Sequence, residues 1–213
     1  MTSVGERFQR DKMLRDLEKR GIRDRRVLDA MGKVPRHRFV RQQFQLQAYS
    51  SYALPSRADQ TISQPYIVAR TTEILELEPH HSVLEIGTGT GYHTAVLALL
   101  AQRVYSLERV HDLARNAIQR IRELGYDNVK IQTFDGTVGW SEVAPFDRIL
   151  VTAGAPRAPR PLLEQLKVGG RLLIPEGSKD AQRLVLYERR EDSYLRHEGE
   201  PVAFVPLLGR HGW

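Results

Sequence analysis

The feature that most constrains the fold is an alternation of short apolar strands and helices that begins at His81. Strands are predicted over residues 82–86, 103–108, 129–133, 146–152, 170–174, 183–188 and 202–207. Helices are predicted between them over residues 92–101, 111–124 and 161–166. Strands that are apolar on both faces and alternate with helices are typical of a parallel sheet covered by helices. The pattern therefore predicts an α/β fold with a doubly wound, mostly parallel seven-stranded sheet.

The N-terminal part of the chain follows a different pattern. Apolar residues at helical spacing predict two short helices separated at Gly21, and residues 35–59 carry turn signals without a regular period. Ser63, with Pro65 two residues later, predicts the N-cap of a third helix. We therefore expect a helical and loop extension over residues 1–59 and a core over residues 60–213 that is one structural unit.

Composition and spacing exclude several chemistries. The chain has no cysteine, which rules out disulfides, thiolate metal ligands and a cysteine nucleophile. Its histidines lack the spacing of a metal site, and the G-x-S-x-G elbow of serine hydrolases is missing. We therefore predict no metal ion. The N-terminus lacks the apolar region of a signal peptide and no apolar run could cross a bilayer, which predicts a cytoplasmic protein without a membrane anchor.

The net charge of +6 is concentrated in one segment. Residues 1–41 carry 13 Lys/Arg against 6 Asp/Glu, whereas the rest of the chain carries 19 against 20. Such an excess is typical of the solvated faces of amphipathic helices, and the alternative is a surface that attracts an anionic partner. Only Phe8 and Phe39 lie among the basic residues, too few aromatic side chains for a platform that stacks single-stranded bases. The sequence disfavours a nucleic-acid partner, and we favour a monomer.

A glycine-rich loop follows the first predicted strand. It contains Gly87, Gly89 and Gly91, which let the backbone turn tightly and approach a ligand at the carboxyl end of the strand. The spacing is G-x-G-x-G, and Tyr92 stands where a dinucleotide fingerprint would place its last glycine. The loop therefore predicts a nucleotide cofactor that has no pyrophosphate.

Two acidic residues follow the next two predicted strands. Glu108 ends the second strand, 17 residues after Gly91, where an acid commonly accepts hydrogen bonds from ribose hydroxyls. Asp135 and Gly136 follow the third strand, where an acid can meet the exocyclic amine of an adenine. Three ligand-facing features at three successive strand ends favour a cofactor site over a set of unrelated loops.

These features resemble the Rossmann-like class I methyltransferases over residues 82–175. Residues 85–91 look like the first motif of that class, Glu108 like its ribose-binding acid and Asp135-Gly136 like its adenine-side element. The resemblance implies S-adenosyl-L-methionine as the cofactor. The Asn/Asp-Pro-Pro-Tyr-like turn of enzymes that methylate nitrogen is missing, because residues 152–156 read Thr-Ala-Gly-Ala-Pro.

A more specific resemblance rests on the heptapeptide Gln60-Thr61-Ile62-Ser63-Gln64-Pro65-Tyr66. It is similar to the signature of the protein-L-isoaspartate O-methyltransferases. Further matches over nearly the whole chain lie at residues 34–40, 53–55, 85–92, 135–140, 144–147, 169–172 and 202–207. Two departures are the loop Ser56-Arg57-Ala58-Asp59, where the family usually has a glycine-bearing turn, and Phe134, which replaces a small residue.

The resemblance implies roles for particular residues. Ser63 is implied to be the catalytic residue and to contact substrate together with the C-terminal segment, of which Val202, Phe204, Pro206 and Leu207 are the expected contacts. The cofactor is implied to contact Thr61, Ile62, Ser63, Glu85, Gly87, Thr88, Gly89, Gly91, Glu108, Asp135 and Gly136.

The implied activity is methyl transfer to the free α-carboxylate of L-isoaspartyl residues in damaged peptides and proteins, which are the expected partners. By the chemistry of the family, the ester then closes to a succinimide whose hydrolysis returns some normal aspartate. The acceptor carboxyl has a pKa of about 3.3–3.7 and is already ionised at neutral pH, so that no general base is needed. We interpret Ser63 as a group that orients this carboxylate and not as a nucleophile.

Two alternatives remain open from the sequence. The first is a related carboxyl methyltransferase that acts on another peptide or a small acid, which the altered loop at Ser56–Asp59 would allow. The second is a non-catalytic cofactor-binding module that contacts RNA or another acidic partner through its basic N-terminal helices.

Overall fold

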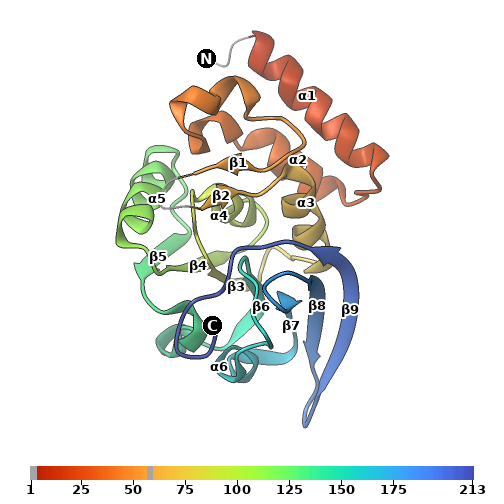
Figure 1. The fold of residues 1–213 in the computed structure, drawn as a ribbon, viewed down its shortest axis with the longest axis vertical. Helices are drawn as coiled ribbons and strands as arrows, with labels where there is room; N and C mark the ends of the chain where they lie inside the picture. The colour runs from red at the N-terminus through yellow and green to blue at the C-terminus, as the bar shows by residue number, and fades with distance from the viewer. Residues whose placement is uncertain (1–3, 57–59) are drawn as a thin grey trace.

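The computed structural model describes residues 4–56 and 60–213. Its centre is a seven-stranded sheet flanked by helices, with strand order β5-β4-β3-β6-β7-β8-β9 (Figure 1). The strands are β3 (Ser82–Ile86), β4 (Arg103–Glu108), β5 (Val129–Thr133), β6 (Phe146–Val151), β7 (Leu166–Gly177), β8 (Gln182–Arg189) and β9 (Tyr194–Val202). β3 to β7 are parallel to one another, and β8 and β9 add an antiparallel edge beside β7. The predicted doubly wound, mostly parallel sheet is confirmed.

Helices and short elements complete the described chain. The α-helices are α1 (Val4–Lys19), α2 (Arg25–Lys33), α3 (Pro65–Ile74), α4 (Tyr92–Ala98), α5 (His111–Glu123) and α6 (Arg160–Glu164). The 3-10 turns are η1 (Arg36–Phe39), η2 (Gln42–Gln47), η3 (Gly136–Val138) and η4 (Ser141–Val143). A two-stranded ribbon pairs β1 (Leu54–Pro55) with β2 (Thr61–Ile62). The loop predicted at Ser56–Asp59 lies outside the described residues except for Ser56.

The strand order indicates where in the sheet a ligand site is expected. The chain moves outward from β3 through β4 to β5 and then returns to the other side of β3 as β6. In open α/β sheets, ligands bind outside the carboxyl ends of the strands at such a change of direction. A ligand site is therefore expected where the loops after β3 and β6 begin, at Gly87 and Thr152.

The last strand was predicted in the wrong place. Residues 202–207 were expected to form it, but the structure has β9 over Tyr194–Val202. β9 is an exposed edge strand held by its antiparallel ladder with β8, and its polar sequence shows no apolar alternation. The predicted segment instead runs back over the sheet, as the dark-blue chain after β9 shows in Figure 1. There Gly154 donates its backbone N–H to Val205 and accepts one from Leu207 at 2.8 and 2.7 Å.

The N-terminal extension packs on the helices of the core. Buried side chains of α1 and α2, among them Met13 and Met31, share one apolar cluster with residues of α3 and α4. The two predicted N-terminal helices are confirmed, and Asp24 caps the second by accepting the N–H of Arg26 at 2.8 Å. The division at residue 59 remains a prediction.

Ser63 is not the N-cap of α3. Gln64 occupies that position without a side-chain capping bond, and Pro65 begins the helix as predicted. Ser63 lies one residue earlier, directly after β2, where its carbonyl is engaged by a buried arginine. Within the described residues, no helix combines the length and the apolar character that a membrane span requires.

Candidate active site

A cavity of about 840 Å³ opens at the carboxyl ends of the central strands. It is bounded by the glycine loop, by the end of β4, by the β2–α3 junction and by the segment after β9. Its lining includes the predicted residues Thr61, Ile62, Ser63, Gly87, Thr88, Gly89, Glu108, Gly136, Val202, Phe204, Pro206 and Leu207. The structure thus brings together residues that are far apart in the sequence.

The glycine loop forms one wall, and its conformation requires glycine. Gly87, Gly89 and Gly91 have φ values of 95°, 54° and 85°, in the left-handed region that L side chains rarely adopt. A Cβ on Gly87 would lie 2.3 Å from Oγ1 of Thr152. That hydroxyl donates to the carbonyls of Ile86 and Gly87 at 3.0 and 2.8 Å. Thr152 therefore ties the end of β6 to the start of the loop.

Glu108 holds the far side of the loop. Its carboxylate accepts the backbone N–H of Gly89 at 2.8 Å on one oxygen and that of Val110 at 2.9 Å on the other. The side chain lines the cavity and the residue is 7% exposed. A carboxylate has about four lone-pair sites, so that acceptor capacity remains on both oxygens for a ligand.

Glu85 lies beneath the loop instead of beside a ligand. Its carboxylate is fully buried and accepts the hydroxyls of Thr94 and Ser106 at 2.5 and 2.6 Å. Ser106 in turn contacts the hydroxyl of Thr88 at 2.6 Å. Burial raises the pKa of Glu85 to about 7, although the two hydroxyl donors favour its ionised form. Glu85 thus reaches the cavity wall through Ser106 and Thr88, and it is not among the described residues that line the cavity.

Asp135 is also turned away from the cavity. One carboxylate oxygen accepts the N–H and the hydroxyl of Thr137, and the other accepts the N–H of Arg210. Burial by itself would raise the pKa of Asp135, but these hydrogen bonds outweigh it and the pKa is lowered. The bond from Arg210 also fixes the C-terminal segment. Gly136 remains at the cavity, where an added Cβ would lie 2.4 Å from Ile86. Asp135 and Gly91, both expected at the cofactor, are not among the described lining residues.

The opposite wall comes from β2 and from the segment after β9. Thr61 and Ile62 form β2, and Ser63 follows with its side chain at the cavity. Among the described residues, no partner is present for the Ser63 hydroxyl. Phe204 is held by Gln182, which donates to its carbonyl at 3.1 Å and accepts its N–H at 2.9 Å. Ser63 and residues 202–207 therefore line the same cavity, and their contacts with a substrate remain predictions.

His93 lines the cavity as a neutral group. Its Nε2 lies 2.8 Å from the hydroxyl of Thr72. Burial, with a further contribution from the positive charge of Arg36, lowers the pKa of His93 to about 3. An imidazole of such low basicity cannot hold a proton at neutral pH.

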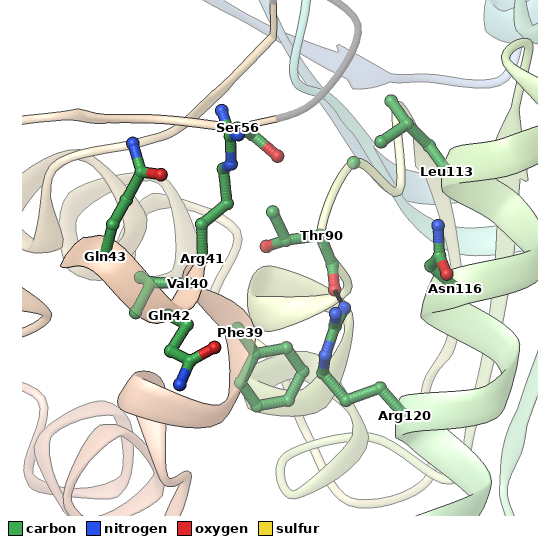
Figure 2. A pocket seen from close by; sticks show the side chains of 11 residues that line it. Phe39, Val40, Arg41, Gln42, Gln43, Ser56, Thr90, Leu113, Asn116 and Arg120 are labelled. Atoms are coloured by element: carbon green, nitrogen blue, oxygen red, sulfur yellow. Dashed lines mark hydrogen bonds between the residues drawn. The ribbon is translucent and has the colours of Figure 1, made fainter. Parts of the chain in front are cut away.

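A second, smaller cavity of about 360 Å³ lies on the outer side of the glycine loop. Figure 2 shows Arg120 of α5 reaching the loop, where its guanidinium donates to the Thr90 carbonyl at 2.6 Å, with the ring of Phe39 beside it. Gly89 and Thr90 line both cavities. The glycine loop therefore separates the two cavities, and its backbone is hydrogen-bonded to Arg120 on one side and to Glu108 on the other.

Comparisons with known proteins agree with this geometry. A model of the family Protein-L-isoaspartate(D-aspartate) O-methyltransferase (PCMT) matches residues 8–212. The chain belongs to this family. Protein-L-isoaspartate O-methyltransferase 1 of Syntrophobacter fumaroxidans is 53% identical over 205 residues, which are 96% of each chain. A relative with the same function name from Geobacter metallireducens is 53% identical over 91% of this chain and 90% of its own.

Solved structures of the same family share the fold. One protein-L-isoaspartate O-methyltransferase superposes with a TM-score of 0.88 at 29% identity, covering 95% of this chain and 67% of its own. Another, described as the enzyme of Plasmodium falciparum, gives a TM-score of 0.83 at 27% identity over 92% of this chain and 97% of its own. That structure is in complex with S-adenosyl-L-homocysteine.

The cavity of this family member fits S-adenosyl-L-methionine. The Glu108 carboxylate keeps acceptor sites for hydroxyl groups, and a Cβ at Gly87 or Gly136 would clash with Thr152 or with Ile86 in the wall. Among the described lining residues, Arg109 is the only Lys or Arg, so the wall offers little positive charge to a phosphate-bearing ligand. The donor set therefore suits a nucleoside without phosphates. In the described part of the chain, no three acidic or histidine side chains are grouped to hold a metal ion.

Several lining residues were missed from the sequence. Thr152, His93 and Val110 line the cavity because strand ends from different parts of the chain meet there. The sequence signal for Thr152 was its position directly after β6, which pairs with β3, at the carboxyl ends of the strands where a ligand was expected. His93 carried no local signal, since only the packing of α4 brings it to the cavity.

Proposed function

We propose that this protein transfers the methyl group of S-adenosyl-L-methionine to the free α-carboxylate of L-isoaspartyl residues in peptides and proteins. One observation carries the proposal. The predicted donor-side groups, Gly87 to Gly89 and Glu108, and the predicted acceptor-side groups, Ser63 and residues 202–207, line the same cavity. Membership of a family named for this reaction supports the same conclusion.

The donor side of the cavity orients the nucleoside part of the cofactor. Glu108 keeps acceptor sites for ribose hydroxyls, while its bonds to Gly89 and Val110 fix the carboxylate. Because these partners are backbone amides, the acid is held in place before the ligand enters. When bound, S-adenosyl-L-methionine supplies an electrophilic methyl group on a positively charged sulfur.

The acceptor side orients a carboxylate and needs no base. The acceptor is already ionised at neutral pH, and the pKa of His93 is lowered to about 3, which leaves that imidazole neutral and weakly basic. Ser63 presents a hydroxyl that donates to one carboxylate oxygen and leaves the other free to attack. Alignment of two bound groups in a site shielded from water accounts for a large share of such a rate enhancement.

The C-terminal segment supports the substrate peptide. Residues 201–208 line the cavity, and Gln182 fixes the backbone of Phe204 from behind. The polar backbone and apolar side chains of this segment suit an extended peptide whose flanking residues vary. We infer contacts from Val202, Phe204, Pro206 and Leu207, as expected from the sequence.

The deciding experiment uses two peptides that differ only in one linkage. The protein is incubated with methyl-labelled S-adenosyl-L-methionine and either an isoaspartyl peptide or its aspartyl twin. The expected result is base-labile label on the first peptide alone, because methyl esters hydrolyse in mild base. Equal labelling of both peptides, label on another acid, or no label would overturn the proposal, and label on RNA would favour the binding-module alternative.

Cytoplasmic location and a monomeric state remain predictions of the sequence. Size-exclusion chromatography with light scattering tests the second, and fractionation of cells tests the first. The basic segment over residues 1–41 is partly engaged in ion pairs, such as Arg25 with Glu18 at 2.6 Å and Arg26 with Glu78 at 3.1 Å. These pairs support the solvated-helix interpretation over a nucleic-acid surface.

A further inference from the structure

Arg36, in the 3-10 turn η1 of the N-terminal extension, is fully buried behind the acceptor wall. Its Nε donates to the carbonyl of Ala48 at 2.7 Å, and its Nη2 donates to the carbonyl of Ser63 at 2.7 Å. The guanidinium carbon lies 4.4 Å from the centre of the Tyr92 ring. One side chain thus joins the extension, the acceptor wall and the first residue of α4.

The burial of this cation is costly for the fold. No carboxylate pairs with Arg36 among the described residues, so that two carbonyls and one aromatic face are its stabilising contacts. An ion without a counter-charge loses far more hydration than a neutral side chain of the same size. Burial accordingly lowers the pKa of Arg36, and its positive charge contributes to the low pKa of His93 at the cavity. The positive charge by itself therefore gives no reason for an arginine at this position.

The placement of the two carbonyls explains why an arginine stands there. A guanidinium presents donors in a rigid, planar fork, so two of its nitrogens can fix two carbonyls from different segments in one geometry. Ser63 lies between β2 and α3, outside the central sheet, and its carbonyl is held by Nη2. Tyr92 directly follows the glycine loop, so the same group contacts the donor side.

We propose that Arg36 is a positioning residue that fixes the backbone of Ser63 relative to the glycine loop, so that the Ser63 hydroxyl meets the acceptor carboxylate in line with the methyl donor. The inference rests on the proposed function, since Ser63 is a proposed catalytic residue. Arg36 itself does not line the cavity as the described residues define it, and it acts through the Ser63 backbone.

The test separates positioning from general support of the fold. Arg36→Met is compared with wild type and with Met31→Ala, which opens a space in the apolar cluster that also contains Tyr92. For Arg36→Met, kcat on an isoaspartyl peptide is expected to fall about tenfold or more, while the Kd of S-adenosyl-L-homocysteine changes less than about threefold. At a temperature where both variants are fully folded, Met31→Ala is expected to keep kcat within about twofold of wild type.

Arg36→Lys covers the case in which the methionine variant fails to fold. A lysine keeps the buried charge but cannot hold both carbonyls in the planar fork, so kcat is expected to fall about fivefold with the Kd of S-adenosyl-L-homocysteine unchanged. Wild-type kcat in either folded variant would overturn the proposal. A parallel loss of kcat in Met31→Ala, or failure of both Arg36 variants to fold, would assign Arg36 to stability and also overturn it. An inactive wild type would instead overturn the proposed function.

Discussion

Replacing Glu108 by glutamine tests the donor side of the site with an almost isosteric change. Both carboxylate oxygens accept backbone N–H groups, from Gly89 at 2.8 Å and Val110 at 2.9 Å. An amide has one oxygen, so its NH2 group must face one of these two donors. The variant therefore loses one of these two backbone bonds, to Gly89 or to Val110, and the negative charge toward the ribose.

The expected magnitude follows from these bonds. A hydrogen bond to a charged group contributes about 1.5–3 kcal/mol, and each 1.4 kcal/mol corresponds to tenfold in affinity. Glu108→Gln should therefore raise the Kd of S-adenosyl-L-methionine and S-adenosyl-L-homocysteine about 10- to 100-fold. Isothermal titration calorimetry at neutral pH measures both constants directly.

A nearby acid provides the matched control. Asp112 stands in the first turn of α5 with its side chain 75% exposed, and Asp112→Asn should leave both constants within about twofold of wild type. Thermal unfolding establishes that both variants are folded. Unchanged affinity in folded Glu108→Gln would refute the assignment of this acid to the cofactor.

Three further perturbations test other parts of the site. Ser63→Ala should lower kcat on an isoaspartyl peptide about 10- to 100-fold and keep calorimetric cofactor affinity, because one bond to a charged acceptor is lost; a matching loss of affinity would contradict this role. The pKa of Glu85 is raised to about 7 from 4.5, so its contribution to stability is fully present below pH 4.5 and is lost as the pH rises through 7. From pH 4.5 to 7 the free energy of unfolding of the wild type, measured in urea, should fall relative to that of Glu85→Gln by on the order of 3 kcal/mol, at about 1.4 kcal/mol per pKa unit. Parallel pH curves for the two proteins would show that the pKa of this carboxyl is not perturbed. Gly87→Ala should lower the melting temperature and weaken cofactor binding, since its Cβ would lie 2.3 Å from Thr152 and its φ is 95°. Adding Thr152→Ala should restore only part of the melting temperature, because the backbone strain remains, and full recovery in calorimetric unfolding would show that the clash alone mattered.

The sequence predicted those parts of the fold whose signal is local. The strands from β3 to β8 and the glycine loop follow from apolar runs and turn residues that adjoin in the chain. β9 was missed because an exposed edge strand is held by its ladder to β8 and needs no apolar alternation. Residues 202–207 were misassigned for the converse reason, since an apolar segment packs on a cavity without forming a ladder.

The candidate site was predictable in its residues more than in their contacts. Glu108 and Ser63 line the cavity as expected. The carboxylate of Glu85 instead accepts hydrogen bonds from buried hydroxyls, and that of Asp135 accepts one from the C-terminal backbone. A sequence motif records which residue types recur near a ligand but not which of them support the wall from behind. Arg36 shows the same limit, because charge counting treats it as one of many surface cations while tertiary packing buries it.

The two walls of the cavity differ in how tightly the rest of the molecule constrains them. The donor wall continues directly from parallel strands whose register is set by neighbours on both sides, so its backbone has little freedom to shift. The acceptor wall is built from a two-residue strand and from a chain segment that crosses the sheet outside its ladder. Evolution can therefore retune which peptides enter without touching the machinery that holds the methyl donor, and a laboratory library aimed at new acceptors belongs on that wall.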